Sequence, residues 1–302
     1  MRPYLAVDWG TTNLRAWRVG ADGVVQDERE LPLGVSQIGE CEAASVFAEH
    51  VRPALHGEDL PALMCGMIGS NLGWRVMPYL DCPADKAALA VHLGDVGERV
   101  RIAPGLRCAG ITGAPDVMRG EETQLIGWIE MAPDRGRGRH IVCHPGTHAK
   151  WALIVDGRIE QFVTAMTGEL FDVLSTHSVL GADEGEDDAK AFDAGVEAAG
   201  DGSALATRLF STRARVVGGD APASSSRSYL SGLLIGAEIA ALAPHFGAAP
   251  ESQIALLGAP ALCAHYNRAL AHRGFHSTVD DGADAALAGF NALVALGALD
   301  AS

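Results

Sequence analysis

The amino-terminal part of the chain places its apolar residues in short runs separated by polar turns. Ala21-Asp22-Gly23, between the second and third runs, is typical of a hairpin turn. The runs predict an antiparallel meander of strands at about 4–8, 14–19 and 24–31. A stretch with helical periodicity follows from about 40 to 55, and an apolar strand follows at 62–65.

A second copy of this opening begins at His140. Aligning Gly10-Thr11 with Gly146-Thr147 places a tryptophan, Trp17 or Trp151, in the strand that follows each turn. The predicted strands of the second copy are 141–143, 150–155 and 158–165. A repeat of this kind indicates a duplicated lobe.

Helices and strands alternate over much of the remaining chain. We expect strands at 253–257 and 275–279, and helices at 120–131, 228–242 and about 283–300. A further helix is expected after Pro260 and ends at His272. The acidic stretch 182–202 is expected to be a solvated helical insertion, and 218–226 a flexible loop. Strands that alternate with helices are typical of the α/β class, in which helices cover a sheet.

The composition narrows the classes of partner. The chain has 302 residues, of which 48% are hydrophobic and 20% charged, and its net charge is −15. The negative field repels nucleic acid and anionic membrane surfaces, and no basic stripe overrules it. We therefore expect no nucleic-acid and no membrane partner. A small anionic ligand stays open, because backbone N–H groups bind phosphate whatever the global charge.

Cysteine usage and the start of the chain bear on location. The six cysteines form no C-x-x-C pair, so zinc and redox sites are not indicated, and we expect most of them to be small buried hydrophobes in a reducing cytosol. No signal peptide and no apolar run of about 18 residues is evident. We expect a soluble cytoplasmic protein, and the oligomeric state, a homodimer included, stays open.

The strongest chemical signal is the segment from Val7 to Trp17, in which an acidic residue ends a strand and a Gly-Thr-Thr hairpin follows. Glycine lets the backbone approach a phosphate, while hydroxyl and N–H groups donate to its oxygens. A carboxylate beside phosphates suits Mg²⁺, which is usually held through waters and one or two carboxylates. The alternative is an ordinary hairpin with a capping Asp8.

This hairpin resembles the first phosphate motif of the actin-like ATPase and sugar kinase superfamily, Asp-x-Gly-Thr-Thr followed by a basic residue. Segment 144–148 stands where the second phosphate hairpin belongs, 256–260 resembles the adenosine motif, and 284–289 resembles the small-residue helix that returns between the lobes. Two departures are the His144-Pro145 pair, in place of acidic or amide residues, and the single glycine of the adenosine motif.

The resemblance implies two ribonuclease H-like lobes, each a mixed βββαβα sheet flanked by helices, with an active-site cleft between them. The Gly-rich connector 134–139 sets the expected boundary, so that 1–134 carries the first phosphate hairpin and the sugar-acid site. Residues 135–302 carry the second hairpin and the adenosine site, and the terminal helix packs back towards the first lobe. Fingerprints of P-loop and Rossmann folds are absent from the sequence.

The ATP-binding residues follow from the same resemblance. Asp8 is expected to hold Mg²⁺ through water, and Gly258 and Ala259 to contact adenosine. The expected phosphate-binding residues are Gly10, Thr11, Thr12, Asn13, Arg15, Gly146, Thr147, His148 and Lys150.

Within the superfamily, segments 66–74, 116–124 and 145–151 resemble the 2-dehydro-3-deoxygalactonokinase family, and the likeness spans nearly the whole chain. It implies transfer of the γ-phosphoryl group of ATP to the 6-hydroxyl of 2-dehydro-3-deoxy-D-galactonate in galactonate catabolism. A kinase of the same fold for another small sugar or aldonic acid, such as 2-dehydro-3-deoxygluconate, is an alternative. A non-catalytic actin-like ATP-binding protein is a further alternative.

Phosphoryl transfer needs charge neutralisation, in-line positioning and a group that accepts the hydroxyl proton. Asp8, Asp116 and Glu121 are the candidate catalytic carboxylates. Asp116 and Glu121 flank a predicted helix start, and Asp116 is slightly preferred as the base because a short side chain before a helix is held more rigidly. An ordinary helix would also select them as a cap and a first-turn acid.

Binding of a sugar acid needs donors for a carboxylate and for hydroxyls. Arg119 offers a planar fork that matches a carboxylate. Ser70, Asn71 and Trp74 follow the end of a predicted strand, where loops often display ligand-binding groups. These four residues are the expected substrate contacts.

Overall fold

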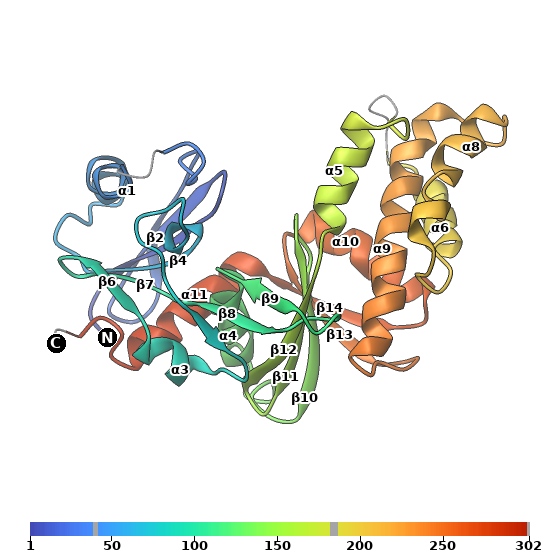
Figure 1. The fold of residues 1–302 in the computed structure, drawn as a ribbon. Coiled ribbons are helices and arrows are strands. Elements are labelled where there is room, and N and C mark those ends of the chain that lie inside the picture. The colour runs from blue at the N-terminus through green and yellow to red at the C-terminus, as the bar shows by residue number, and fades with distance from the viewer. Residues whose placement is uncertain (39–41, 182–186, 301–302) are drawn as a thin grey trace. The chain divides into compact units, whose positions relative to one another are not determined.

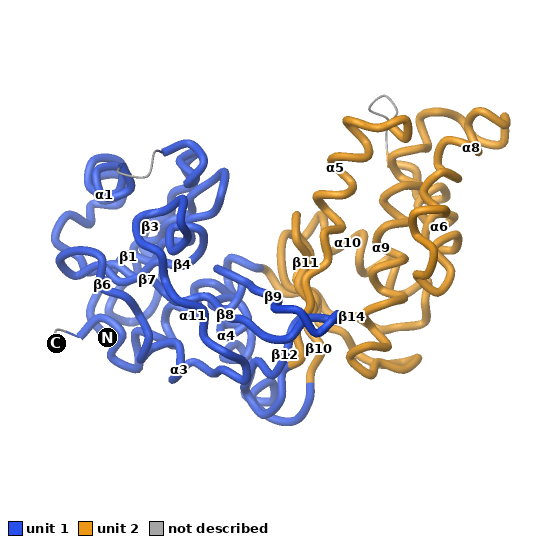
Figure 2. Tube along the Cα trace, in the orientation of Figure 1, with its two compact units in different colours: residues 1–139, 154–162, 282–302 blue, residues 140–153, 163–281 orange. Residues whose placement is uncertain are grey.

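The computed structural model describes residues 1–38, 42–181 and 187–300, and within it the chain divides into two compact units. Figure 2 shows them in different colours. Unit 1 comprises 1–139, 154–162 and 282–302, and unit 2 comprises 140–153 and 163–281. The predicted connector 134–139 therefore closes the first segment of unit 1.

A six-stranded sheet forms the centre of unit 1, in the order β3-β2-β1-β4-β7-β6 (Figure 1). The predicted meander pairs antiparallel, while β1, β4 and β7 run parallel. β1 and β4 are central because nearly all their residues are apolar and buried, whereas β3 is polar and lies at an edge. The strands are β1 (Tyr4–Trp9), β2 (Leu14–Val19), β3 (Val25–Leu31), β4 (Ala62–Gly66), β6 (Gly94–Gly97) and β7 (Val100–Ile102).

A second sheet repeats this arrangement with five strands, in the order β12-β11-β10-β13-β14. β13 runs parallel to both β10 and β14, as β4 does to β1 and β7. The duplication expected from the sequence is therefore present in the strand order. The strands are β10 (Arg139–His144), β11 (Ala149–Val155), β12 (Arg158–Ala165), β13 (Gln253–Gly258) and β14 (His276–Asp281).

A small third sheet lies between Trp74 and Arg119, in a region where no element was predicted from the sequence. Its strands are β5 (Tyr79–Asp81), β8 (Gly105–Ala109) and β9 (Pro115–Met118), and α3 (Lys86–Val91) lies between β5 and β6. These strands have three to five residues each and include exposed positions, so they give no periodicity long enough to recognise.

Apart from α3, the helices of unit 1 lie close to the predicted positions. The stretch expected at 40–55 is one helical segment built from α1 (Ala43–Val46), η1 (Phe47–Val51) and α2 (Arg52–Ala54), and residues 40 and 41 lie outside the described residues. α4 (Glu121–Glu130) packs along α11 (Gly282–Ala295). This packing is close because Gly127 and Gly289 face backbone atoms of the opposite helix.

Unit 2 carries most of its helices on the segment after β12. They are α5 (Thr167–His177), α6 (Ala189–Ala198), α7 (Leu205–Arg208), α8 (Ser211–Val217), α9 (Ser226–His245) and α10 (Pro260–His272). The expectation of a solvated insertion at 182–202 was wrong for α6, because Phe192 and Val196 are buried against α9. Residues 182–186 of that stretch lie outside the described residues. Ser225 and Ser226, at the end of the expected loop 218–226, are buried.

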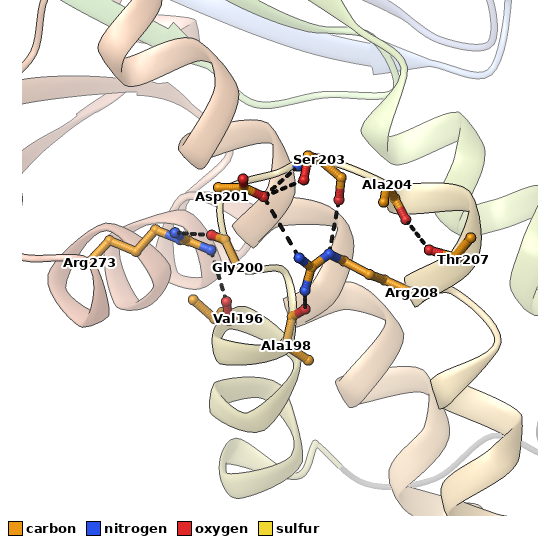
Figure 3. Close-up of polar contacts among 9 residues, drawn as sticks. All are labelled: Val196, Ala198, Gly200, Asp201, Ser203, Ala204, Thr207, Arg208 and Arg273. Atoms are coloured by element: carbon orange, nitrogen blue, oxygen red, sulfur yellow. Dashed lines mark hydrogen bonds and ion pairs between the residues drawn. The ribbon is translucent and has the colours of Figure 1, made fainter.

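Two arginines bind the carboxyl end of α6, as Figure 3 shows. Arg208 donates to Ala198 O at 2.8 Å, and Arg273 donates to Val196 O at 3.0 Å and to Gly200 O at 2.8 Å. The last carbonyl groups of a helix lack partners within the helix, so these contacts satisfy them and fix the end of α6.

Each unit has its own hydrophobic core. The core of unit 1 is built on Val7, Trp9 and Phe47, and that of unit 2 on Trp151, Phe192 and Tyr266. Among the described residues, no helix is both long and apolar enough to cross a membrane.

The contact between α4 and α11 predicts a stability effect. A Cβ on Gly127 would lie 1.7 Å from Ala285 O, so Gly127→Ala has to force the helices apart. We expect a loss of about 1–3 kcal/mol in the free energy of unfolding, measured by urea denaturation, although alanine is the better helix former. Gly136→Ala, where the nearest atom is 3.8 Å away, is the control and should leave stability unchanged. Equal stability of Gly127→Ala and wild type would contradict this packing.

Candidate functional site

The first Gly-Thr hairpin joins β1 to β2 and turns its carbonyl groups inwards. The N–H groups of residues 34–36 donate to the carbonyl oxygens of Gly10, Thr11 and Thr12 at 2.9–3.0 Å. Residue 34 has to be glycine, because a Cβ there would lie 2.2 Å from the carbonyl carbon of Thr12. With the carbonyl groups engaged, the exposed Thr11 and Thr12 can offer hydroxyl and N–H donors to an anion.

Asn13 and Arg15 contact the neighbouring strand β3. Arg15 pairs with Glu30 at 3.3 Å and lies 3.8 Å from Glu28, and Asn13 Nδ2 lies 3.5 Å from Glu30 Oε1. These groups are exposed, and exposed ion pairs contribute only about 0–1 kcal/mol. Arg15 can therefore leave Glu30 for a phosphate at little cost.

Asp8 lies at the end of β1 and meets the start of α4. Its Oδ2 accepts a hydrogen bond from Gln124 Nε2 at 3.3 Å, and Cys65 Sγ lies 3.7 Å from its Oδ1. Burial raises the pKa of Asp8 to about 6, the hydrogen bond from Cys65 lowers it in part, and the charge of Glu121 raises it further. The carboxylates of Asp8 and Glu121 thus lie close enough to interact, and the amide group of Gln124 contacts Asp8.

Two glycines allow this meeting of strands and helix. Gly66 ends β4 with φ +90°, and Gly120 precedes α4 with φ +105°. A Cβ on Gly66 would lie 2.7 Å from Trp9 O, and a Cβ on Gly120 would lie 3.1 Å from Gly66 Cα. Other residues rarely adopt such φ values and would also push the backbones apart. The two glycines therefore hold the amino end of α4 against the end of β1.

The first turn of α4 carries two acidic residues with different surroundings. Glu121 Oε2 accepts the N–H of Arg119 at 3.0 Å, and its side chain is partly exposed. Glu122 is fully buried, and its Oε2 accepts the N–H of Gly120 at 2.7 Å. Burial raises the pKa of Glu122 to about 8. Glu122 was not among the residues predicted from the sequence, although two adjacent acids at a helix start were a usable signal.

The two candidates for the base lie on different elements. Asp116 is on β9, directly opposite Cys108 of β8 in the three-stranded sheet. Glu121 is on α4, where its charge acts on Asp8. The structure thus brings Glu121 close to Asp8, whereas Asp116 lies in the three-stranded sheet.

Arg119 is a buried cation with unused donors. Its side chain lies over the ring of Tyr79 at 4.4 Å, and its Nη2 donates to Met77 O at 2.8 Å. Only 9% of the residue is exposed, and Nε and Nη1 have no hydrogen-bond partner among the described residues. Buried donors left unpaired are costly, so this guanidinium favours an anionic ligand.

The other expected substrate residues differ in their surroundings. Ser70 Oγ donates to Met67 O at 2.7 Å and accepts from the N–H of Leu72, which stabilises the loop. Trp74 packs on Phe47, with ring centroids 6.1 Å apart. Asn71 is exposed. Ser70 and Trp74 thus shape the loop that carries Asn71.

The second Gly-Thr hairpin, in unit 2, is held by the start of α5. Thr147 O accepts the N–H of Glu169 at 3.0 Å, and His148 Nε2 lies 2.5 Å from Glu169 Oε2. A Cβ on Gly168 would lie 2.5 Å from Gly146 O, so only glycine allows this approach. Lys150 is 4% exposed and donates to His148 O at 3.2 Å.

A cavity of about 540 Å³ opens beside this hairpin. Its volume lies within the range of small-molecule sites. Gly258 and Ala259 are not among its lining residues, but α10, which begins just after them, forms one wall. The lining includes Gly146 and Gly168, apolar Phe171, Phe192 and Leu262, and polar Arg227, Ser228 and His265.

A buried carboxylate joins three elements of unit 2 around this cavity. Glu238 of α9 accepts hydrogen bonds from Trp151 Nε1 at 2.7 Å and from Tyr266 OH at 2.8 Å, and it also interacts with Thr167 at the start of α5. Burial raises the pKa of Glu238, and the three hydrogen bonds lower it in part. Tyr266 and Thr167 line the cavity, so Glu238 fixes two of its walls to β11.

The geometry agrees with the comparisons with known proteins. The family model described as 2-keto-3-deoxy-galactonokinase matches residues 8–293. The chain belongs to this family. The resemblance found in the motifs is thereby confirmed, over nearly the whole chain.

Curated relatives agree with this membership of the 2-keto-3-deoxy-galactonokinase family. The chain is 39% identical over 292 residues to the 2-dehydro-3-deoxygalactonokinase of Escherichia coli (strain K12), covering 96% of this chain and 97% of that one. It is also 39% identical over 299 residues to the probable 2-dehydro-3-deoxygalactonokinase DgoK1 of Rhizobium meliloti (strain 1021), covering 96% and 95% of the two chains.

Solved structures confirm the fold. The crystal structure of a putative 2-dehydro-3-deoxygalactonokinase from Sinorhizobium meliloti superposes with a TM-score of 0.88 at 37% identity, covering 97% of this chain and 98% of that one. The activator of 2-hydroxyisocaproyl-CoA dehydratase from Clostridium difficile, solved with bound ADPNP, has a TM-score of 0.52 at 13% identity, covering 99% of each chain. The predicted fold of actin-like ATPases and sugar kinases is therefore confirmed.

Glu238 gives a pH-dependent prediction. Because its folded pKa lies above the ordinary value of 4.5, its contribution to stability is full below that pH and is lost as the pH rises towards the folded pKa. Glu238→Gln keeps the size and polarity of the side chain but removes the carboxyl group that titrates. We therefore expect its free energy of unfolding, measured by urea denaturation, to fall less than that of wild type as the pH rises from 4.5.

Glu238→Ala is the matched comparison. It leaves Trp151 Nε1 and Tyr266 OH without their buried acceptor, which should cost on the order of 3 kcal/mol at every pH. Parallel pH profiles for wild type and Glu238→Gln would rule out a raised pKa at this position.

Proposed function

We propose that this protein transfers the γ-phosphoryl group of ATP to the 6-hydroxyl of 2-dehydro-3-deoxy-D-galactonate, a step in galactonate breakdown. The observation that carries the proposal is the buried guanidinium of Arg119, with Nε and Nη1 unpaired, in a chain of the 2-keto-3-deoxy-galactonokinase family. A sugar acid supplies the carboxylate that these donors lack.

The acceptor half of the site is in unit 1. Arg119 binds the carboxylate through Nε and Nη1, while Tyr79 and Met77 hold its guanidinium in place. Gly69 lets Arg119 approach, because a Cβ there would lie 2.9 Å from Nη1. Asn71, on the loop shaped by Ser70 and Trp74, donates to or accepts from sugar hydroxyls.

The nucleotide is bound through both hairpins and the cavity of unit 2. The adenosine occupies the cavity beside α10, where Phe171 and Phe192 offer apolar faces and Ser228 offers a hydroxyl. The phosphates bind the N–H groups of Gly146 and Thr147 with the ammonium group of Lys150. Thr11, Thr12 and Arg15 of the first hairpin supply the remaining donors.

The residues around Asp8 fit Mg²⁺, a hard cation that prefers oxygen ligands and retains several waters. Asp8 would hold the ion through water, with the Glu121 carboxylate and the Gln124 amide group close by. When bound, Mg²⁺ neutralises the charge that develops on the phosphate oxygens. An adjacent cation also favours the ionised form of Asp8.

Glu121 is the base in this proposal. Its carboxylate accepts the proton of the 6-hydroxyl as that oxygen attacks the γ-phosphorus, the bond to the β-phosphate oxygen breaks, and ADP leaves. Support comes from its place beside Asp8 and from its hydrogen bond to the N–H of Arg119, which orients it close to the carboxylate-binding residue. Asp116 faces Cys108 instead.

The assignment of the base predicts unequal effects of two isosteric variants. Glu121→Gln should lower kcat by about 10²–10⁴-fold, because a general base contributes that much, while its amide oxygen can still accept the N–H of Arg119. Asp116→Asn should stay within a few-fold of wild type. Steady-state kinetics decide between them, and the reverse ranking would return the role to Asp116.

A substrate panel tests the function itself. With ATP and Mg²⁺, and with ADP release followed by a coupled assay, kcat/KM should be highest for 2-dehydro-3-deoxy-D-galactonate and at least about tenfold lower for its C4 epimer 2-dehydro-3-deoxy-D-gluconate. A preference for the epimer would support the alternative sugar kinase. Sugar-independent ATP turnover or polymerisation would support a non-catalytic actin-like protein.

Arg119→Lys, measured in the same panel, tests the carboxylate site. Lysine cannot form the planar fork, so KM for the sugar acid should rise by roughly 10–100-fold while KM for ATP stays unchanged. Arg29→Lys, on the exposed edge strand β3, is the control. An unchanged KM for the sugar acid in Arg119→Lys would place the carboxylate elsewhere.

A further inference from the structure

Two cysteines of unit 1 lie side by side on neighbouring strands. β5 and β8 pair in parallel with Asp81 opposite Arg107, and the N–H of Cys82 continues the ladder by donating to Arg107 O at 2.9 Å. Cys82 therefore lies opposite Cys108, and their side chains point to the same face of the sheet. The two thiols interact by a hydrogen bond.

The spacing suits a disulfide bond. Neighbouring strands lie about 4.8 Å apart, which is inside the range of roughly 4.4–6.8 Å for the Cα atoms of bonded cysteines. Both residues are also partly exposed, whereas Cys65, Cys143 and Cys263 are fully buried. The expectation that most cysteines are buried hydrophobes therefore does not extend to this pair, and Cys41 lies outside the described residues.

The surroundings of the pair assign different roles to its members. The N–H of Phe162 donates to Cys108 Sγ at 3.4 Å, which favours the thiolate of Cys108, and in the neutral form the thiol donates to Phe162 O at 3.1 Å. The hydrogen bond to Cys108 and burial raise the pKa of Cys82. A thiolate is the form that reacts with peroxides, so Cys108 is the more reactive of the two.

We propose that Cys82 and Cys108 are an oxidation site that forms a reversible disulfide with hydrogen peroxide. The Cys108 thiolate attacks the peroxide, and with one proton it yields a sulfenic acid and one water. The Cys82 thiol then attacks the sulfenic sulfur, and the S–S bond forms as a second water leaves. Two thiols lose two electrons and two protons in total, and the peroxide takes them up.

The position of the pair connects it to the candidate site. Tyr79, whose ring stacks on Arg119, is on β5, and it lies opposite Gly105 of β8. On the other side of β8, Cys108 lies opposite Asp116 of β9, the strand that leads into Arg119. The bond therefore ties together two strands of the sheet that supports Arg119.

Peptide mapping tests the proposal on the wild-type protein. The purified full-length chain is treated with hydrogen peroxide, blocked with N-ethylmaleimide, digested and analysed by mass spectrometry without reduction. We expect a peptide pair cross-linked through Cys82 and Cys108 that disappears after treatment with dithiothreitol. Separate alkylation of both cysteines, or pairing of either one with Cys41, would overturn it.

Variants separate the two roles. In Cys82→Ser the sulfenic acid should persist on Cys108 and react with dimedone, whereas Cys108→Ser should show little labelling at Cys82. Cys41→Ser is the matched control and should form the same cross-link as wild type. Circular dichroism establishes whether each variant is folded. If a variant does not fold, the peptide mapping of the wild-type protein still tests whether Cys82 and Cys108 form the disulfide. Stronger dimedone labelling of Cys82 than of Cys108 would overturn the assigned order.

Discussion

Backbone contacts that only glycine permits fix the local structure around Asp8 and around each of the two Gly-Thr hairpins. Gly34 lets residues 34–36 bind the carbonyl groups of the first hairpin, and Gly168 lets α5 approach the second hairpin in the same way. Gly66 and Gly120 bring the end of β4 and the start of α4 to Asp8. Interiors are close-packed, so a single added Cβ at these points has no space to enter without moving a main chain. The placement of each hairpin and of Asp8 therefore depends on glycine, which has no Cβ, at these four positions.

Burying carboxyl groups in this arrangement costs free energy of folding when they are ionised. Asp8, Glu122 and Glu238 all have a raised pKa, chiefly because burial disfavours their charged form. For Asp8, the stability that its proton provides is present below the ordinary pKa of 3.8 and is lost as the pH rises to about 6. The hydrogen bonds from Gln124 to Asp8, from Gly120 to Glu122 and from Trp151 to Glu238 offset part of the cost. A bound cation would offset more of it at Asp8, which links ligand binding to stability.

Sequence could predict the elements that have long, uniform patterns, but not those defined by distant contacts. The strand that carries Asp8 and the strand before Gly146 each contain a buried apolar run and are followed by a Gly-Thr turn, and their duplication was visible in the sequence. β5, β8 and β9 are too short to leave such a signal. Sequence left the choice between Asp116 and Glu121 open because the two flank a predicted helix start, whereas the position of Glu121 near Asp8 depends on the contact of Gly66 with Gly120. Glu238 escaped notice because its partners Trp151 and Tyr266 are far away in the chain.

In the proposed site, the distribution of charge would let an acidic protein select anionic ligands. A net charge of −15 repels anions at long range, and the exposed Arg15 is already paired with Glu30. Arg119 and Lys150 are different, because burial keeps them from bulk water and from screening ions. Their attraction acts over a short distance and is strong there, since the surrounding dielectric is low. An anion benefits only when its own groups reach these donors, so the selection depends on shape as well as on charge.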